Sequence, residues 1–427
     1  MEQLIIEGGQ TLEGEVEVSG AKNAILPILA GCLLAEGQST IRNVPDLSDV
    51  RTMIDVLRAL GGDVQWVGHN RIQVEMTNPT IFEAPYDLVR QMRASFWVMG
   101  PLLARLGKAS VPMPGGCEIG VRPVDLHLKG LRALGADIEV EGGNVVARAK
   151  EGLVGTEIYL GGHFGSSVGA TVNVLLASVL ARGKSVIHCS ACEPEVSDLA
   201  NFLNLMGAKI QGIGSPRLEI EGVESLNGTD YFVIPDRIEA ATLLMAGAIT
   251  RGNVRVINSR PDHISAILDL MREMEVPVEI GDRWMQVHGN GTFRSVDVTT
   301  HPYPGFPTDA QAQMMALLTT VDGISVISEY IFPDRFRHVA ELNRLGAGIR
   351  KENFHAIVGG KQRLSGAQLT ASDLRASAAL VLAGLVAEGK TRVQHLEHLD
   401  RGYEQLEKKL TSLGAKIHRE RVEVDGV

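Results

Sequence analysis

The segment Ala376-Ser-Ala-Ala-Leu-Val-Leu-Ala-Gly-Leu-Val-Ala-Glu388 carries small or apolar side chains on nearly every side of a helix. A helix without a polar face has to be buried all round. Gly389 follows at once, and glycine just past a helix end is a common stop signal. The residues after it are rich in β-forming side chains. The segment therefore predicts a buried helix that leads into a strand.

This pattern occurs six times along the chain, and such a repeat is the strongest structural signal in the sequence. The closing glycines lie 66 to 76 residues apart, at positions 37, 107, 183, 252, 323 and 389. The apolar runs are Ala24–Glu36, Ala94–Leu106, Val168–Arg182, Glu239–Arg251, Ala312–Asp322 and Ala376–Glu388. Midway through each unit, an amphipathic helix is expected to end at a second glycine, as in Leu413-Gly414-Ala415. The fourth unit has Met274-Glu275-Val276 at this place.

Each unit is predicted to contain a buried helix, a strand, an amphipathic helix and two further strands. We expect an α/β fold with two inverse, barrel-like domains, each built from three units with buried helices and outer sheets. The break is expected near Ile234-Pro235-Asp236, so residues 22–234 form one domain and residues 1–21 and 235–427 the other. One strand within residues 1–21 is expected to complete the second domain, because the sixth unit runs out of chain.

Composition narrows the classes of function. The chain has 427 residues, a formal net charge of −10 and 4% aromatic residues, which argues against a nucleic-acid partner. The apolar runs are too short for a membrane span and the N-terminus does not resemble a signal peptide, so a cytoplasmic location is expected. Cys189-Ser-Ala-Cys192 has no second Cys/His pair at a zinc-like distance. We therefore expect neither a metal nor a cofactor.

One loop has the composition of a reactive site. The run from Pro112 to Pro123 holds three prolines, three glycines and Cys117, with Arg122 five places after the thiol. Proline and glycine exclude a helix or a central strand here. A thiol beside a cation and open backbone amides is placed to be reactive. The alternative is a Gly/Pro turn with an incidental cysteine.

Cations stand at the expected N-termini of four inner helices, where the helix dipole disfavours positive charge. They are Lys22, Arg93, Arg237 and Arg375. A bound anion would compensate, so the pattern favours anion-binding helix ends that converge on a gap between domains. The alternative is an exposed arginine paired with the neighbouring aspartate, which suits Arg237 after Asp236 and Arg375 after Asp373.

Nine short motifs can be compared with known families, and they are spread over essentially the whole chain. They are Ser19–Asn23, Ala84–Val89, Met92–Ser95, Pro114–Gly120, Arg122–His127, Ser167–Thr171, Phe306–Asp309, Asp373–Ser377 and Asp400–Tyr403. Together they resemble the UDP-N-acetylglucosamine 1-carboxyvinyltransferases of the enolpyruvyl transferase family. The resemblance implies two inverse α/β domains of three repeats each, with the active site in the cleft between them.

The resemblance also implies an activity. The enolpyruvyl group of phosphoenolpyruvate would move to the 3-hydroxyl of UDP-N-acetylglucosamine with release of phosphate, the first committed step of peptidoglycan synthesis. The route would be addition and elimination through a tetrahedral intermediate, without a metal. Cys117 would protonate the methylene carbon, and its presence predicts covalent inactivation by the epoxide fosfomycin. Asp309, in a setting expected to raise its basicity, would take the hydroxyl proton; a simple helix cap is the alternative.

The other site residues implied by the resemblance fall into three groups. Lys22, also assigned to catalysis, would hold the phosphate and carboxylate of phosphoenolpyruvate together with Arg93, Arg122 and Arg401. The sugar and the uridine diphosphate would contact Asn23, Pro123, Val124, Asp125, Leu126, His127, Ser166, Ser167, Val168, Gly169 and Ile331. Arg335 and Arg375 would support the closed cleft, while positioning or stability is expected of Glu193, Asp236 and Arg237.

Two other functions stay open. The shikimate-pathway enolpyruvyl transferase shares the six-unit architecture but accepts shikimate 3-phosphate; Cys117 in its Gly-rich loop and the pair Lys22-Asn23 count against it. The second alternative is a catalytically silent member that binds the nucleotide sugar as a sensor. The complete set of reactive and anion-binding residues named above counts against that loss of activity.

Overall fold

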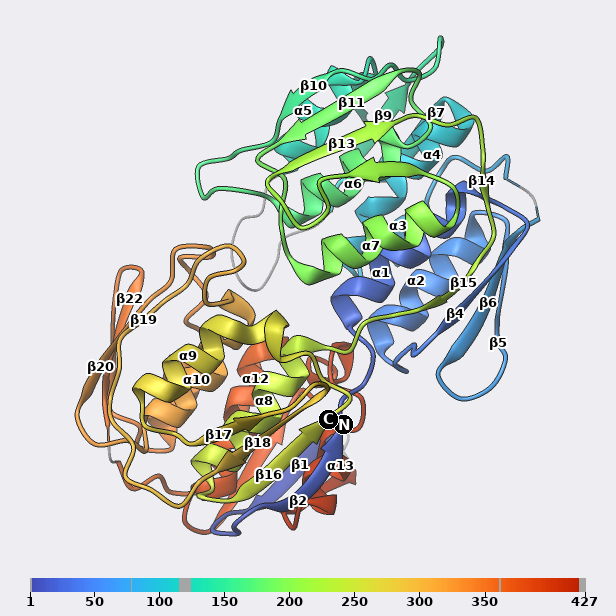
Figure 1. Cartoon of the computed structure of the whole chain (residues 1–427). Coiled ribbons are helices and arrows are strands. Elements are labelled where there is room, and N and C mark those ends of the chain that lie inside the picture. The colour runs from blue at the N-terminus through green and yellow to red at the C-terminus, as the bar shows by residue number, and fades with distance from the viewer. Residues whose placement is uncertain (1, 78, 115–123, 361, 422–427) are drawn as a thin grey trace. The chain divides into compact units, whose positions relative to one another are not determined.

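The computed structural model describes residues 2–77, 79–114, 124–360 and 362–421. These residues fall into two compact units (Figure 1). The N-terminal unit comprises the described residues from Gly20 to Ile234. The C-terminal unit comprises those up to Ser19 together with those from Pro235 onward. The chain therefore enters and leaves the N-terminal unit at two neighbouring crossover points, where Asp236 N donates to Ser19 O at 2.9 Å.

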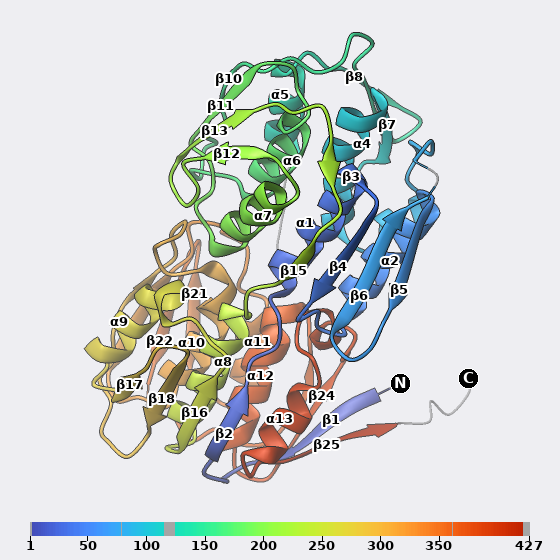
Figure 2. The same cartoon turned by 45° about the vertical axis from the view of Figure 1, so that its right-hand side comes forward.

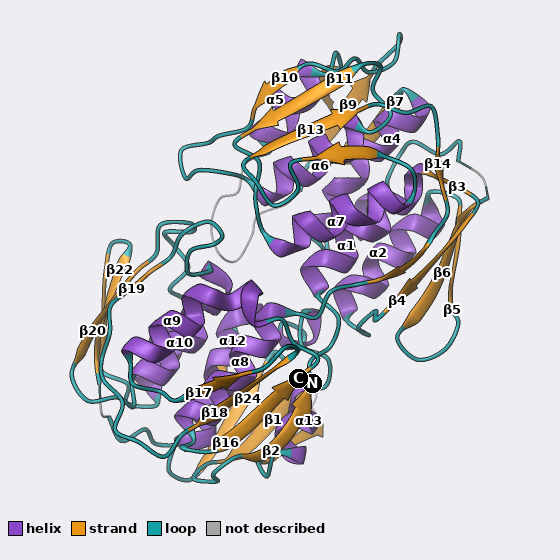
Figure 3. Cartoon of the chain, viewed as in Figure 1, coloured by secondary structure: helices purple, strands orange, loops and turns teal. Residues whose placement is uncertain are grey.

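Apolar helical segments form the centre of the N-terminal unit (Figure 3). Helix α1 (Lys22–Gly31) is buried except at Asn23, and α6 (Val168–Ser178) is buried from Ala170 onward. The remaining segment begins as the 3-10 helix η2 (Arg93–Val98) and continues as α4 (Met99–Leu106), which packs against α6. The other helices are η1 (Cys32–Leu34), α2 (Ser48–Ala59), α3 (Tyr86–Val89), α5 (Asp125–Ala133) and α7 (Pro194–Leu205).

The C-terminal unit has a corresponding bundle. Helices α8 (Arg237–Ile249) and α10 (Gln311–Leu318) are buried along their whole length, and α12 (Leu374–Val386) is buried from Arg375 to Leu385. The three helices pack against one another. The prediction of inner helices that are buried on all sides is thus confirmed. The other helices are η3 (Pro261–Ile264), α9 (Ser265–Glu273), η4 (Thr308–Ala310), α11 (His338–Arg344), η5 (Leu399–Arg401) and α13 (Leu406–Ser412).

Sheets lie outside the helices in each unit, as predicted, and share one topology (Figure 3). The first two strands of each four-stranded sheet pair in parallel and the others pair antiparallel. The orders are β15-β4-β6-β5, β10-β11-β13-β12, β2-β16-β18-β17, β19-β20-β22-β21 and β23-β24-β1-β25. In the sheet β7-β9-β8, an isolated parallel bridge between Glu83 and Ser110 takes the place of the parallel strand.

The strands are short in both units. Those of the N-terminal unit are β3 (Ala35–Glu36), β4 (Gln38–Arg42), β5 (Gly62–Trp66), β6 (Arg71–Met76), β7 (Lys108–Pro112), β8 (Asp137–Glu141), β9 (Asn144–Arg148), β10 (Glu157–Tyr159), β11 (Lys184–His188), β12 (Lys209–Gln211), β13 (Arg217–Glu221), β14 (Leu226–Asn227) and β15 (Asp230–Phe232). Those of the C-terminal unit are β1 (Glu2–Glu7), β2 (Glu13–Glu17), β16 (Asn253–Ile257), β17 (Val278–Ile280), β18 (Trp284–His288), β19 (Val298–Thr299), β20 (Ile324–Ser328), β21 (Ile349–Glu352), β22 (His355–Gly359), β23 (Gln368–Thr370), β24 (Lys390–Gln394) and β25 (Lys416–Arg421).

The first residues of the chain complete the C-terminal unit. Strand β1 lies between β24 and β25 and pairs antiparallel with both (Figure 2). Strand β2 pairs in parallel with β16. The sequence predicts one strand in this segment and the structure has two, because a short strand with a single buried side chain, as in β2, carries little hydrophobic signal.

The two glycine signals have different structural roles. Gly107, with φ +69°, is the C-cap of α4. In the other units the inner helix ends several residues earlier and the glycine stands directly before a strand, as Gly183 stands before β11. The expectation that each of these glycines stops a helix is therefore wrong for most of them. The glycines of the second set have φ between +93° and +113°, and Glu275 takes their place in the fourth unit with φ +60°.

Among the residues that the structure describes, no helix has both the length and the apolar composition needed to cross a membrane.

Glu275→Gly is expected to stabilise the protein by roughly 1 kcal/mol, because glycine adopts a positive φ without the steric cost of a Cβ atom. The ion pair lost with Arg294, at 3.0 Å, is solvent-exposed and contributes little. Urea unfolding measures the change. Gly135→Ala is the control, because its φ is +96° and nothing lies within 4 Å of an added Cβ, so only backbone strain should destabilise it. A Glu275→Gly variant no more stable than the parent would contradict this explanation.

Candidate active site

Lys22 forms a buried ion pair in the N-terminal unit. It begins α1, and its Nζ lies 2.7 Å from Oδ2 of Asp49 in the first turn of α2. Lys22 is 8% exposed and Asp49 is 4% exposed. Sequence reasoning missed Asp49, because an acidic residue in the first turn of an amphipathic helix is ordinary. Asn23, the next residue of α1, is half-buried.

His127 lies in α5 among residues of the inner helices. Asn173 of α6 donates from Nδ2 to His127 Nδ1 at 3.1 Å, and the same amide accepts from Gly100 N at 2.6 Å. These two contacts fix the amide orientation and place the imidazole proton on Nε2. Burial, reinforced by the positive charge of Arg93, lowers the pKa of His127 to about 3. The histidine is therefore neutral at physiological pH.

The first turn of α6 adjoins this histidine. A Cβ built on Gly169 would lie 2.9 Å from His127 Nε2, and Trp97 Nε1 donates to Gly169 O at 3.2 Å. Ser167 caps α6 by accepting from Ala170 N at 3.3 Å. The structure thus places His127 and Gly169, one member of each predicted group, next to each other.

The predicted residues of this unit differ in exposure. Half-buried side chains are those of Arg93, Leu126, Ser166, Ser167 and Val168, whereas Asp125 is exposed and Val124 is buried. Cys117, Arg122 and Pro123 lie outside the described residues.

In the C-terminal unit, Asp309 is held between two arginines. Arg335 Nη1 lies 2.7 Å from Oδ1 of Asp309, and Arg375 Nη2 lies 2.9 Å from Oδ2. The arginines are 6% and 1% exposed, whereas the Asp309 side chain is 26% exposed. Asp309 belongs to η4, which leads directly into the buried helix α10. Side chains from three segments therefore meet at the carboxylate of Asp309: η4, the chain just before α11, and the first turn of α12.

These contacts make Asp309 a weaker base than the sequence predicts. Burial alone would raise the pKa of its carboxyl group, but Arg375 and Arg335 outweigh this effect and hold the pKa well below the usual value. The sequence-based expectation that desolvation raises the basicity of Asp309 is therefore wrong, because the two arginines lower the pKa of its carboxyl group. The sequence could not show this, because both arginines are distant from Asp309 along the chain.

The exposed-arginine alternative is also wrong. Asp373 accepts from the backbone N–H groups of Arg375 and Ala376 and so caps α12, while the Arg375 side chain pairs with Asp309. Asp236 caps α8 in the same way, and the Arg237 side chain is 9% exposed.

Arg375 is the most informative of these cations. Its guanidinium lies 5.4 Å from the centre of the Tyr403 ring. Only Nη2 is used by Asp309, and Nε and Nη1 are buried with no hydrogen-bond acceptor among the described residues. A buried N–H without an acceptor is unfavourable, particularly on a charged group. These two nitrogens therefore favour an acceptor that is not part of the described protein.

Two further predicted residues lie on nearby turns. Ile331 is half-buried, and its N–H donates to Glu329 Oε1 at 2.9 Å. Arg401 ends η5 and is half-buried. The adjoining Asp400 accepts from Arg419 Nη1 of β25 at 2.9 Å, which ties this turn to the sheet. Glu329 and Arg419 were missed, because neither carries a sequence motif.

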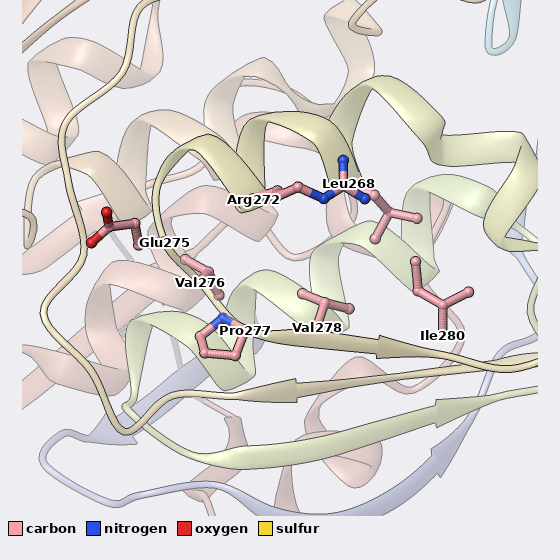
Figure 4. A pocket seen from close by; sticks show the side chains of 7 residues that line it. All are labelled: Leu268, Arg272, Glu275, Val276, Pro277, Val278 and Ile280. Carbon is pink, nitrogen blue, oxygen red and sulfur yellow. The ribbon is translucent and has the colours of Figure 1, made fainter.

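A surface cavity of about 280 Å³ lies elsewhere on the C-terminal unit, between α9 and β17 (Figure 4). Its lining includes Arg272, Glu275 and Pro277. It contains none of the predicted site residues.

Comparisons with known proteins identify the family to which the chain belongs. The family model for EPSP synthase (3-phosphoshikimate 1-carboxyvinyltransferase) matches residues 6–410. UDP-N-acetylglucosamine 1-carboxyvinyltransferase 1 of Staphylococcus epidermidis is 53% identical over 421 residues, which is 98% of this chain and 99% of that protein. UDP-N-acetylglucosamine 1-carboxyvinyltransferase 2 of Carboxydothermus hydrogenoformans is 52% identical with the same coverage.

The fold is also similar to that of solved structures. The enolpyruvyl transferase NikO from Streptomyces tendae has a TM-score of 0.89 and 27% identity, with 98% of both chains covered. EPSP synthase from Acinetobacter baumannii has a TM-score of 0.74 and 17% identity, covering 99% of this chain and 100% of that one. The latter shows a likeness of fold alone.

The low pKa of His127 predicts a pH-dependent stability. Its value in the folded protein, about 3, lies below the ordinary 6.5, so the unfolded chain binds more protons between these values. Stability should fall as pH falls through this window, by roughly 2 kcal/mol from near pH 7 to near pH 5. Urea unfolding at the two pH values should show a loss that is roughly 2 kcal/mol smaller in His127→Gln than in the wild type. Some loss should remain in the variant, because burial also lowers the pKa of His338, to about 4. His69→Gln, at an exposed position, is the control. An equal loss in all three proteins would exclude His127 as the cause.

Proposed function

The chain belongs to the EPSP synthase family of carboxyvinyltransferases, and from this premise we propose that it transfers the enolpyruvyl group of phosphoenolpyruvate to the 3-hydroxyl of UDP-N-acetylglucosamine. The choice of acceptor rests on relatives 52–53% identical over 98% of the chain that are named for this sugar nucleotide. Phosphate is the second product. The reaction would be the first committed step of peptidoglycan synthesis and would take place in the cytoplasm.

The observation that carries the proposal is the buried guanidinium of Arg375. Charged groups that leave water need fixed partners, and Asp309 satisfies only one of its nitrogens. A phosphate or carboxylate oxygen is the acceptor that a guanidinium fork binds best. The two remaining nitrogens therefore support the binding of an anionic substrate at this position.

The chemistry assigns a role to each reacting group. Cys117 donates a proton to the methylene carbon of phosphoenolpyruvate while the sugar oxygen forms a bond to its C2 atom. Asp309 accepts the proton of the sugar hydroxyl. In the elimination, the thiolate of Cys117 takes a proton back from the new methyl group and the carbon–carbon double bond re-forms as phosphate leaves. The proton held by Asp309 leaves with the phosphate, so both reacting groups return to their starting states. Lys22, Arg93, Arg122 and Arg401 bind the phosphate and carboxylate groups throughout, and Arg375 adds the contact argued above.

Substrate binding is proposed to activate Asp309. Its pKa is low because Arg375 and Arg335 stabilise the charged form. An anion that engages Arg375 competes for the same positive charge. The carboxylate then becomes a stronger base once the anionic substrate is bound, which couples proton removal to substrate binding.

The nucleotide is proposed to bind at the start of α6. Backbone N–H groups at a helix N-terminus favour phosphate groups, and the first residues of α6 are only half-buried. Asn23, Pro123, His127 and Gly169 are assigned to the sugar nucleotide, as is Ile331 of the other unit. The proposal thus assigns residues of both units to a single reaction.

A substrate exchange tests this function. Phosphate release is measured with phosphoenolpyruvate and either UDP-N-acetylglucosamine or shikimate 3-phosphate. We expect release with the sugar nucleotide and none with shikimate 3-phosphate. The reverse preference would identify the chain as a shikimate-pathway enzyme. Binding of the sugar nucleotide without any phosphate release would instead favour a catalytically silent sensor.

A further inference from the structure

Glu329 is a fully buried carboxylate that the proposed chemistry does not use. It is 0% exposed and directly follows β20. Its Oε1 accepts from Thr300 Oγ1 at 2.8 Å and from the N–H groups of Ile331 and Phe332, each at 2.9 Å. Its Oε2 accepts from Thr308 Oγ1 at 2.8 Å. Four donors on one carboxylate fix its position and that of each donor.

One of these donors leads to the candidate base. Thr308 immediately precedes Asp309, and its Oγ1 accepts from Arg335 Nη1 at 3.1 Å. The same nitrogen of Arg335 lies 2.7 Å from Asp309 Oδ1. Because the Thr308 hydroxyl gives its proton to Glu329, its lone pairs are left to accept from Arg335. The carboxylate of Glu329 therefore sets the direction of the hydroxyl that orients Arg335.

The other oxygen of Glu329 holds the turn from which Arg335 comes. The bonds to Ile331 N and Phe332 N fix the start of this turn, and Arg335 N donates to Phe332 O at 2.8 Å. Glu329 thus holds both the turn that carries Arg335 and the segment that carries Asp309. Arg335 and Asp309 are 26 residues apart in the sequence.

We propose that Glu329 is a positioning residue for the transfer reaction, acting through the Thr308 hydroxyl to align Arg335 with Asp309. The inference rests on the proposed function, because it concerns the group assigned as the base. Glu329 does not touch the reacting atoms. Its effect is on the orientation of Arg335, and through it on the basicity of Asp309.

The chain provides a matched pair of variants for the test. Thr308→Val removes the hydroxyl between Glu329 and Arg335. Thr300→Val removes another hydroxyl that donates to Glu329 at the same distance, 2.8 Å. This hydroxyl also accepts from Tyr330 N at 3.0 Å, and among the described residues it makes no hydrogen bond to Asp309 or Arg335. Both changes preserve side-chain shape and leave Glu329 with one donor fewer. Thr308→Ser restores the hydroxyl.

The variants are compared by kcat, by KM for UDP-N-acetylglucosamine and by the pH dependence of kcat. Thr308→Val is expected to lower kcat about tenfold, as loss of one hydrogen bond to a charged group would, with KM changed by less than about twofold. The acidic limb of its pH profile should move to higher pH, because a misaligned Arg335 lowers the pKa of Asp309 less. Thr300→Val and Thr308→Ser should resemble the wild type in kcat and in pH profile.

Thermal unfolding shows whether each variant is folded. Thr308→Ala is measured as well as Thr308→Val, so that the role of the Thr308 hydroxyl can be tested with whichever variant folds. Equal kcat values and pH profiles for the Thr308 and Thr300 variants, with an active wild type, would overturn the role of Glu329 and leave the proposed function intact. A wild type that releases no phosphate with the sugar nucleotide would overturn the proposed function, and this inference with it.

Discussion

The paired salt bridges of Asp309 with Arg335 and Arg375 are the contacts on which the C-terminal unit's candidate site depends. They connect η4, the turn before α11 and the first turn of α12. Removing Asp309 would leave the two buried guanidinium groups without this ion-pair partner. An unpaired buried charge is far more destabilising than the ion pair is stabilising. The unit supports these groups with further hydrogen bonds. Asp373 accepts from backbone N–H groups at the start of α12, and Glu329 accepts from Thr308 and from the N–H group of Ile331.

The inverse architecture explains why charges gather at helix ends. Each inner helix is buried along its length, so its first turn is the main place where polar side chains can be accommodated. Backbone N–H groups without intrahelical partners also lie there. Lys22, Arg93 and Arg375 all occupy such first turns. The same feature that makes the bundles apolar thus concentrates charged side chains at the first turns of these helices.

The repeat was predictable from sequence, because apolar helices and left-handed glycines leave a local pattern. Glu275 shows that the backbone keeps its left-handed turn even where the glycine is missing. The partners of the charged groups were not predictable. Tertiary packing within each unit brings Asp49 to Lys22, Glu329 to Thr308 and Arg419 to Asp400. No local pattern distinguishes these residues from surface acids and bases. For the same reason, the sequence suggested Asp373 as the partner of Arg375, whereas the structure pairs Arg375 with Asp309. The pKa of Asp309 was expected to be raised, and the two arginines lower it instead.

The central claim is that the buried nitrogens of Arg375 bind an anionic substrate. Calorimetric titration with phosphoenolpyruvate alone, which has no acceptor with which to react, tests it most directly. Arg375→Met keeps an unbranched side chain of similar length but removes the guanidinium. If these nitrogens bind the anion, the affinity for phosphoenolpyruvate should be at least about tenfold weaker in this variant, equivalent to the loss of one hydrogen bond to a charged group. Equal affinity in the wild type and Arg375→Met would contradict it.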